Sequence, residues 1–155
     1  MAGFRLSFDE LVWLMNENGI LAYPTWLNNS LDNSRIHNIT ASLVSKEILF
    51  ECEDKYAISP VIEYIMSRMS KAQIWLTISN MYFIYIDTEI VVALFNAFDS
   101  MVTVTPYESP EQCFIAVHSA IDGNIEYTFI VDESSADKKT FSDKVRLIWE
   151  KLYEQ

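Results

Sequence analysis

The histidines and cysteines are the residues best suited to metal binding or nucleophilic catalysis, and their spacing favours neither. His37 and His118 lie far apart, and Cys52 and Cys113 form no C-x-x-C pair. Zinc sites need several such ligands at short, regular spacings. Cys113 and His118 are five residues apart, which on a helix turns them about 140° away from each other. We therefore expect no metal site and no cysteine–histidine dyad, and we interpret both cysteines as reduced, buried thiols.

Phosphate binding and serine-hydrolase chemistry also lack their usual sequence signatures. The chain has three glycines, Gly3, Gly19 and Gly123, and each is isolated. A phosphate-cradling loop or a G-x-S-x-G elbow needs several glycines close together. The acidic residues near Glu51 and Asp132 lack the spacing of a calcium loop. We expect solvated acidic surfaces there, no cofactor, and a protein that is not an enzyme.

The net charge of the chain indicates which classes of partner it can bind. Eleven basic residues against 22 acidic ones give the chain a net charge of −11. Nucleic acids are bound mainly through Lys and Arg, which neutralise phosphates, and an anionic membrane surface repels an acidic domain in the same way. We therefore expect neither nucleic acid nor a membrane as the partner. Another polypeptide, in particular a basic one, fits this charge.

The chain has no segment that reads as a signal peptide or a membrane span. The opening MAGFRLSFDELVW is interrupted by charges, and the longest apolar run, IVVALF at 90–95, is far shorter than a bilayer requires. We expect a cytoplasmic protein.

Residues 5–71 predict a helix-helix-hairpin segment followed by a third helix. Ser7 and Glu10 form a capping-box pair at the start of the first helix, and Gly19 is placed to end it. A second helix is expected over 34–48, a hairpin around Asp54-Lys55, and a third helix from Pro60. The order resembles a winged helix. Its expected wing is acidic, however, so DNA binding is not favoured.

Residues 72–131 predict mostly sheet. Four β-branched and aromatic runs are separated by short polar breaks, which is typical of an antiparallel meander. The run at 89–98 also fits a helix, and the strand is favoured. A helix from Ser109, a further strand IEYTFIV and a closing helix over 141–154 complete a single α+β domain, 1–155. We expect its sheet to hold four to five strands and to pack against helices.

Three apolar side chains fall outside the predicted buried faces of their helices. Trp13 points away from the apolar face of the first helix, Leu147 projects away from that of the last helix, and Tyr153 lies beyond the edge of the latter. Exposed aromatic and apolar side chains are enriched at protein interfaces. We predict that Trp13, Leu147 and Tyr153 bind a partner, with coverage by neighbouring elements as the alternative.

Over residues 5–121 the order of these segments resembles one half of an EspG-type chaperone of type VII (ESX) secretion systems. The stretches that carry the resemblance are LSFDELVWLMNENGILAYPTWL, SLVSKEIL, ISPVIEYIMSRMSKA and SPEQCFIAVHSAI. The resemblance implies a cytoplasmic, non-enzymatic protein that binds the helical tip of a secretion substrate. Members of the family have two such halves, so it also implies that this chain forms a homodimer or lacks the family's activity.

Two other functions fit the same sequence. An acidic immunity protein that neutralises a secreted toxin would use its charge to associate rapidly with a basic toxin. A winged-helix-like regulator is the third reading, and it conflicts with the charge of the hairpin.

Overall fold

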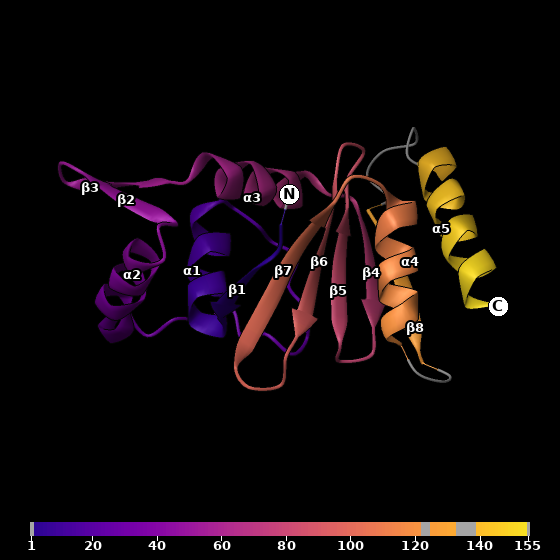
Figure 1. Ribbon diagram of the computed structural model, residues 1–155, viewed down its shortest axis with the longest axis horizontal. Helices are drawn as coiled ribbons and strands as arrows, with labels where there is room; N and C mark the ends of the chain where they lie inside the picture. The colour runs from indigo at the N-terminus through magenta and orange to yellow at the C-terminus, as the bar shows by residue number, and fades with distance from the viewer. Residues whose placement is uncertain (1, 122–124, 133–138, 155) are drawn as a thin grey trace.

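The computed structural model describes residues 2–121, 125–132 and 139–154 as one elongated α+β structure. Its helices are α1 (Phe8–Glu17), α2 (Ile36–Ser45), α3 (Pro60–Lys71), α4 (Pro110–Ala120) and α5 (Lys139–Tyr153), with a short 3₁₀ helix, η1 (Asn33–Arg35), before α2. Its strands are β1 (Phe4–Ser7), β2 (Leu49–Cys52), β3 (Lys55–Ile58), β4 (Ile74–Ile78), β5 (Tyr82–Ile86), β6 (Val91–Asn96), β7 (Met101–Tyr107) and β8 (Tyr127–Val131). Figure 1 shows α2 and the β2–β3 hairpin at one end and α5 at the other.

Six antiparallel strands form the main sheet in the order β1-β7-β6-β5-β4-β8. The predicted meander is confirmed as β4 to β7, and the ambiguous run is a strand, β6. The sheet is larger than expected because β1 was not predicted. β1 has only four residues and ends at Ser7, which is also the N-cap of α1, so its strand signal overlaps a helix signal. β8 pairs with β4, distant in sequence, in a register that sets Ile130 opposite Trp75.

The expected helix-helix-hairpin segment is present. The capping box at Ser7 and Glu10 forms, since each side chain accepts a hydrogen bond from the other residue's backbone N–H. Gly19 has a φ of 68°, and the N–H of Ile20 donates to the carbonyl of Met15 at 3.0 Å. This is the 6→1 bond of a Schellman motif, which turns the chain sharply out of α1. β2 and β3 form a separate two-stranded sheet.

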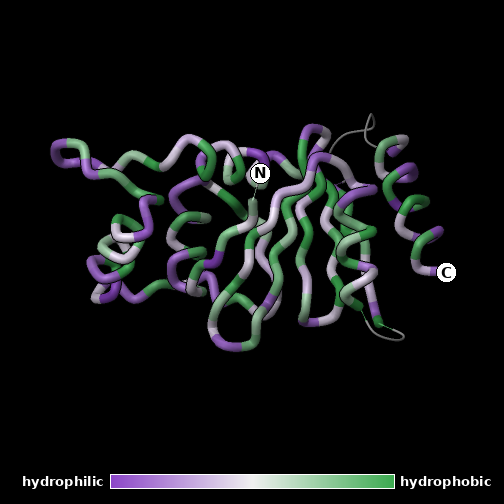
Figure 2. Tube along the Cα trace, viewed as in Figure 1, coloured by the Kyte–Doolittle hydropathy of each residue, from purple (hydrophilic) through white to green (hydrophobic). Residues whose placement is uncertain are grey.

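Both faces of the main sheet carry buried apolar side chains. Figure 2 shows hydrophobic residues along the strands of this sheet. The face toward α1 and α3 is buried over β1, β7, β6 and β5, with Tyr85 and Leu94 among its residues. The opposite face is buried under α4 and α5 over β4, β5 and β6, with Leu76 and Ile84 among its residues. The two helical layers are therefore offset across the sheet, and each leaves the strands at one side uncovered.

Phe141, Val145, Ile148 and Leu152 line up along α5 at helical spacing, and all four pack against the core. The most buried residues of the helix are Ser142, Val145 and Trp149. Trp149 is fully buried, and its ring makes edge contacts with Phe114 of α4 at 5.4 Å and with Tyr127 of β8 at 5.5 Å. Trp149 therefore lies between α4 and the end of the sheet.

Replacing Trp149 with Ala should lower the free energy of unfolding by about 3–5 kcal/mol, because it leaves a large cavity at this junction. Urea unfolding followed by circular dichroism measures the change. Leu147→Ala, on the exposed side of the same helix, is the matched control and should change the free energy by less than about 0.5 kcal/mol. Equal effects of the two substitutions would contradict this packing.

Candidate functional site

An open groove runs beside β4 and β8, the strands that the helices α1 and α3 leave uncovered. One wall is the segment 19–26, which follows α1, and the other is the exposed face of β4 and β8. Two adjoining hollows of about 300 Å³ and about 260 Å³ make up this β8 groove. The first is lined by Gly19, Leu21, Ala22, Met69, Ser70, Ala72, Trp75 and Asp132, and the second by Tyr23, Pro24, Thr25, Trp26, Thr77, Ser79, Tyr82, Phe83, Thr128 and Ile130.

Hydrogen bonds hold the wall of the groove against the sheet. The Tyr85 hydroxyl, which is buried in the sheet face, donates to the carbonyl of Ala22 at 2.5 Å. Desolvation by burial raises the pKa of Tyr85 well above its ordinary value, so this hydroxyl stays protonated and remains a donor. The Tyr23 hydroxyl donates to the side chain of Asn16 on α1. The segment is thus fixed from both sides, and the groove is preformed.

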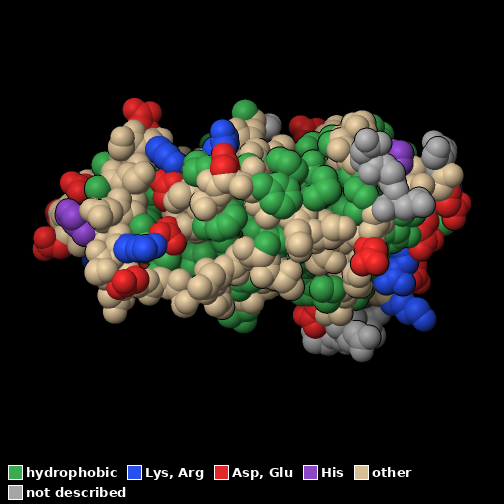
Figure 3. Space-filling model, turned by 90° about the horizontal axis from the view of Figure 1, so that it is seen from below, with side chains coloured by type: hydrophobic (Ala, Val, Ile, Leu, Met, Phe, Trp, Pro, Cys, Tyr) green, Lys and Arg blue, Asp and Glu red, His purple; other side chains and the backbone are tan. Residues whose placement is uncertain are grey.

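The groove exposes large apolar side chains. Leu21 is 92% exposed on one wall, and Ile130 is 46% exposed on the other. Thr128 is exposed beside Ile130, and Trp75 is half-buried. Figure 3 shows the underside of the molecule, where hydrophobic side chains gather over the middle and most charged side chains lie toward the two ends. Exposed apolar surface of this kind is typical of a binding site.

A second exposed surface is the β2–β3 hairpin, which projects from the body (Figure 1). Phe50 and Tyr56 are each more than 40% exposed. The carboxylates of Glu51, Glu53 and Asp54 are exposed at and beside its turn. The hairpin therefore combines apolar side chains with negative charge.

The structure places the three predicted partner-binding residues in different surroundings. Leu147 is 52% exposed on α5, as the sequence predicts. Trp13 packs against the core, and its ring meets that of Tyr56 edge-on at 6.5 Å, so the hairpin covers it. Tyr153 also packs against the core, and its hydroxyl donates to the carbonyl of Ile125 at 2.9 Å. Trp13 and Tyr153 are therefore half-buried against elements remote in sequence, which agrees with the alternative of coverage by neighbouring elements.

None of the three lines the β8 groove. The sequence reading missed Leu21 because it lies in a loop without periodicity. It missed Ile130 because alternation within a strand does not reveal which face is left uncovered.

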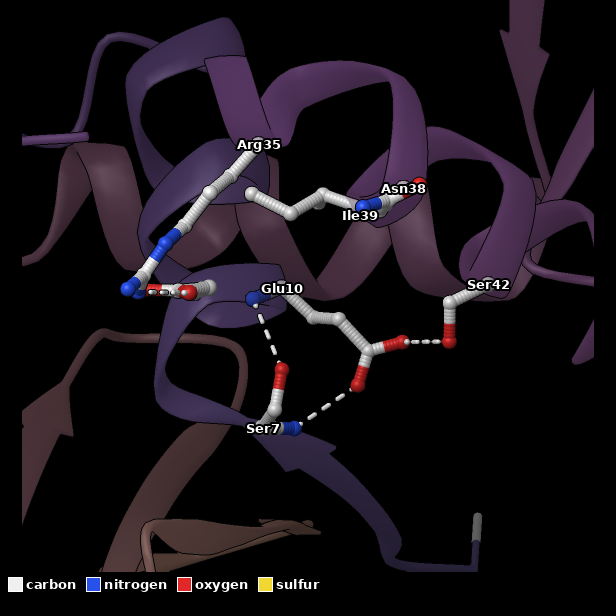
Figure 4. Close-up of a pocket in the computed structure, with 7 residues that line it drawn as sticks. Ser7, Glu10, Arg35, Asn38, Ile39 and Ser42 are labelled. Atoms are coloured by element: carbon white, nitrogen blue, oxygen red, sulfur yellow. Dashed lines mark hydrogen bonds and ion pairs between the residues drawn. The ribbon is translucent and has the colours of Figure 1, made fainter. Parts of the chain in front are cut away.

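A polar pocket of about 350 Å³ lies between the start of α1 and α2, with Glu10 on its wall (Figure 4). The Glu10 side chain is only 4% exposed. Its carboxylate accepts hydrogen bonds from the Ser7 N–H at 2.8 Å, the Ser42 hydroxyl at 3.0 Å and Lys46 Nζ at 2.6 Å. Arg35 pairs with Asp9 at 3.4 Å beside them.

The charge of Glu10 is matched within the fold. Desolvation by burial acts to raise the pKa of Glu10, but the hydrogen bonds from Lys46, Ser7 and Ser42 outweigh it and hold the pKa below its ordinary value of 4.5. Because its carboxylate is already paired, Glu10 serves to join α1 to α2 and is not a free acid or base.

The cysteines differ in exposure. Cys113 is buried in α4, as expected, and desolvation raises the pKa of its thiol well above the ordinary range. Cys52 is exposed, so the prediction of a buried thiol is wrong for this residue. Cys52 lies on β2, whose hairpin projects from the body and leaves this side chain uncovered.

The described residues contain no group of three or more His, Cys, Asp or Glu side chains arranged to hold a metal ion. Within the same ranges, no helix has the length and apolar character needed to cross a membrane. No protein-family model matches the chain, and no curated protein matches it either.

Replacing Glu10 with Gln should lower the free energy of unfolding at neutral pH by about 1–3 kcal/mol, because Lys46 loses its buried partner. A carboxyl whose pKa is lowered by folding stabilises the native state above the unfolded pKa, and this stabilisation disappears as the pH falls through the native value. The difference in the free energy of unfolding between the parent chain and E10Q should therefore become smaller below pH 4.5. Urea unfolding across this range measures it. E17Q, at an exposed position of α1, should show neither effect.

Thiol titration with a chromogenic disulfide should detect one fast-reacting thiol in the native chain and both in denaturant. Cys52 is accessible to the reagent, whereas Cys113 is buried and its thiolate is disfavoured. The variant C52S should have no fast-reacting thiol. A native C52S protein that reacts as fast as the parent would contradict the burial of Cys113.

Proposed function

We propose that this chain is a non-enzymatic protein-binding module, and that the β8 groove is its binding site. The observation that carries the proposal is the exposed apolar surface of the groove, above all Leu21 and Ile130, on walls fixed by internal hydrogen bonds. A preformed apolar surface loses little conformational entropy on binding. The net charge of −11 adds a preference for basic partners.

Its role is that of a cytoplasmic chaperone or adaptor for a type VII secretion substrate. The resemblance of residues 5–121 to one half of an EspG-type chaperone supports this role, and so does the α+β architecture with its helix-helix-hairpin segment. A chaperone of this kind shields an apolar segment of its substrate until export. The β8 groove offers a surface suited to such a segment.

The second candidate is an immunity protein that neutralises a basic toxin. The exposed carboxylates of Glu51, Glu53 and Asp54 on the projecting hairpin favour it, because clustered negative charge accelerates association with a basic surface. Binding of this kind weakens steeply with added salt. A chaperone that acts through an apolar groove would show a smaller dependence.

Purification of the tagged full-length chain from its own cells tests the two roles. A chaperone should recover a helical secretion substrate, and an immunity protein should recover a toxin domain. The affinity of the recovered partner, measured by calorimetry, should fall at least about tenfold for Ile130→Asp, because a charge in the groove has to be desolvated on binding.

Ile115→Asp is the matched control, since Ile115 is also exposed but lies on α4, outside the groove. It should bind as the parent does. Leu147→Asp, measured in parallel, tests the interface predicted from the sequence for α5. Equal affinity of Ile130→Asp and the parent would rule out the groove as the binding site.

A further inference from the structure

We propose that the partner binds by adding an extended strand to the edge of β8, and that this strand carries a basic residue opposite Glu126, next to an alternating apolar segment. The inference rests on the protein-binding function proposed above and names its mode of binding. In this mode the bound segment of the partner is extended and not helical.

The register of β8 on β4 leaves alternate backbone groups free for such a strand. The Asp132 N–H donates to the Gln73 carbonyl at 2.8 Å, and the Ser79 N–H donates to the Glu126 carbonyl at 3.0 Å. In an antiparallel pair these bonds recur at every second residue. The backbone N–H and carbonyl groups of the even-numbered residues of β8 therefore point toward β4. Those of Tyr127, Phe129 and Val131 point away from the sheet.

No described strand lies beyond β8 in the sheet. Edge strands are usually protected by charge, proline, a bulge or very short length. β1, at the other edge, is four residues long and carries Arg5, which pairs with Asp99 at 3.2 Å. β8 is one residue longer, and its sequence, YTFIV, contains no charge and no proline. β8 therefore lacks the charged residue that β1 carries.

The side chains of β8 define the chemistry of the added strand. Thr128 and Ile130 face the β8 groove and are exposed. Glu126 lies on the same face and is exposed, so a carboxylate stands at one end of this apolar stretch. Residues directly opposite each other in an antiparallel pair share a face. The complementary strand thus places Lys or Arg opposite Glu126 and β-branched residues opposite Thr128 and Ile130.

A second copy of this chain fits the edge poorly. If the β8 strands of two copies paired antiparallel through Tyr127, Phe129 and Val131, Phe129 of one copy would lie opposite Phe129 of the other. The same register sets Glu126 of one copy opposite Asp132 of the other, and like charges directly opposite are unfavourable. Each copy also carries a net charge of −11. A basic strand meets the same edge with opposite charge.

Residue-resolved amide exchange of the full chain with a synthetic peptide, Lys-Thr-Val-Thr-Val-Thr-Lys, tests the proposal. Binding should slow exchange at Tyr127, Phe129 and Val131, whose N–H groups point outward. The amides of Thr128 and Ile130 should change little, because they already bond to β4. This alternation is specific to strand addition and is not expected for a helix lying in the groove.

Two matched peptides separate backbone pairing from charge. Lys-Thr-Val-Pro-Val-Thr-Lys lacks the central N–H and should bind at least about tenfold more weakly. Glu-Thr-Val-Thr-Val-Thr-Glu reverses the end charges and should bind about tenfold more weakly at low ionic strength. Equal affinity for the proline peptide, or no alternating protection by the first peptide, would overturn strand addition.

Two further outcomes also count against the inference. Outward amides already protected in the free chain, together with a dimeric mass that falls on dilution, would make a second copy the occupant. A natural partner that needs Ile130 but leaves the outward amides unprotected would overturn strand addition while the protein-binding function stands. Failure to recover any partner would instead overturn the proposed function.

Discussion

The central strands of the sheet are apolar on both faces, and this constraint determines the rest of the architecture. β5 and β6 alternate between two buried surfaces, so helices have to cover the sheet from both sides. Among the described elements, α1 and α3 with the segment 19–26 cover one face, and α4 and α5 cover the other. Since neither layer spans six strands, the two are offset, and each face keeps an uncovered area.

The two uncovered areas differ in chemistry. Over β7, the face turned away from α1 presents Thr103 and Thr105, which are polar and suited to water. Over β4 and β8, the opposite face presents Trp75 and Ile130 beside the exposed Leu21. The first area is polar, so it is stable in contact with water without a partner. The second area leaves apolar side chains in contact with water. The distinction favours the β4–β8 side as the place where a partner binds.

Local signals in the sequence were sufficient for much of the fold. The capping box at Ser7, the glycine end of α1, the start of α3 at Pro60 and the meander all depend on residues close in sequence. The burial of Trp149 and the covering of Trp13 depend on contacts between remote elements, which periodicity cannot reveal. The β8 groove has the same origin, since it exists only because β8 pairs with β4 beyond the reach of the α1 layer.

Negative charge links the candidate site to the behaviour of the whole chain. An apolar groove beside an unprotected strand edge would promote self-association in a neutral protein. A net charge of −11 opposes the approach of a second copy at long range. In the proposed mode of binding, the same field attracts a basic segment toward the edge of β8 and toward Glu126 beside it. On this proposal, the acidity of the chain both opposes self-association at that edge and favours basic polypeptides as partners.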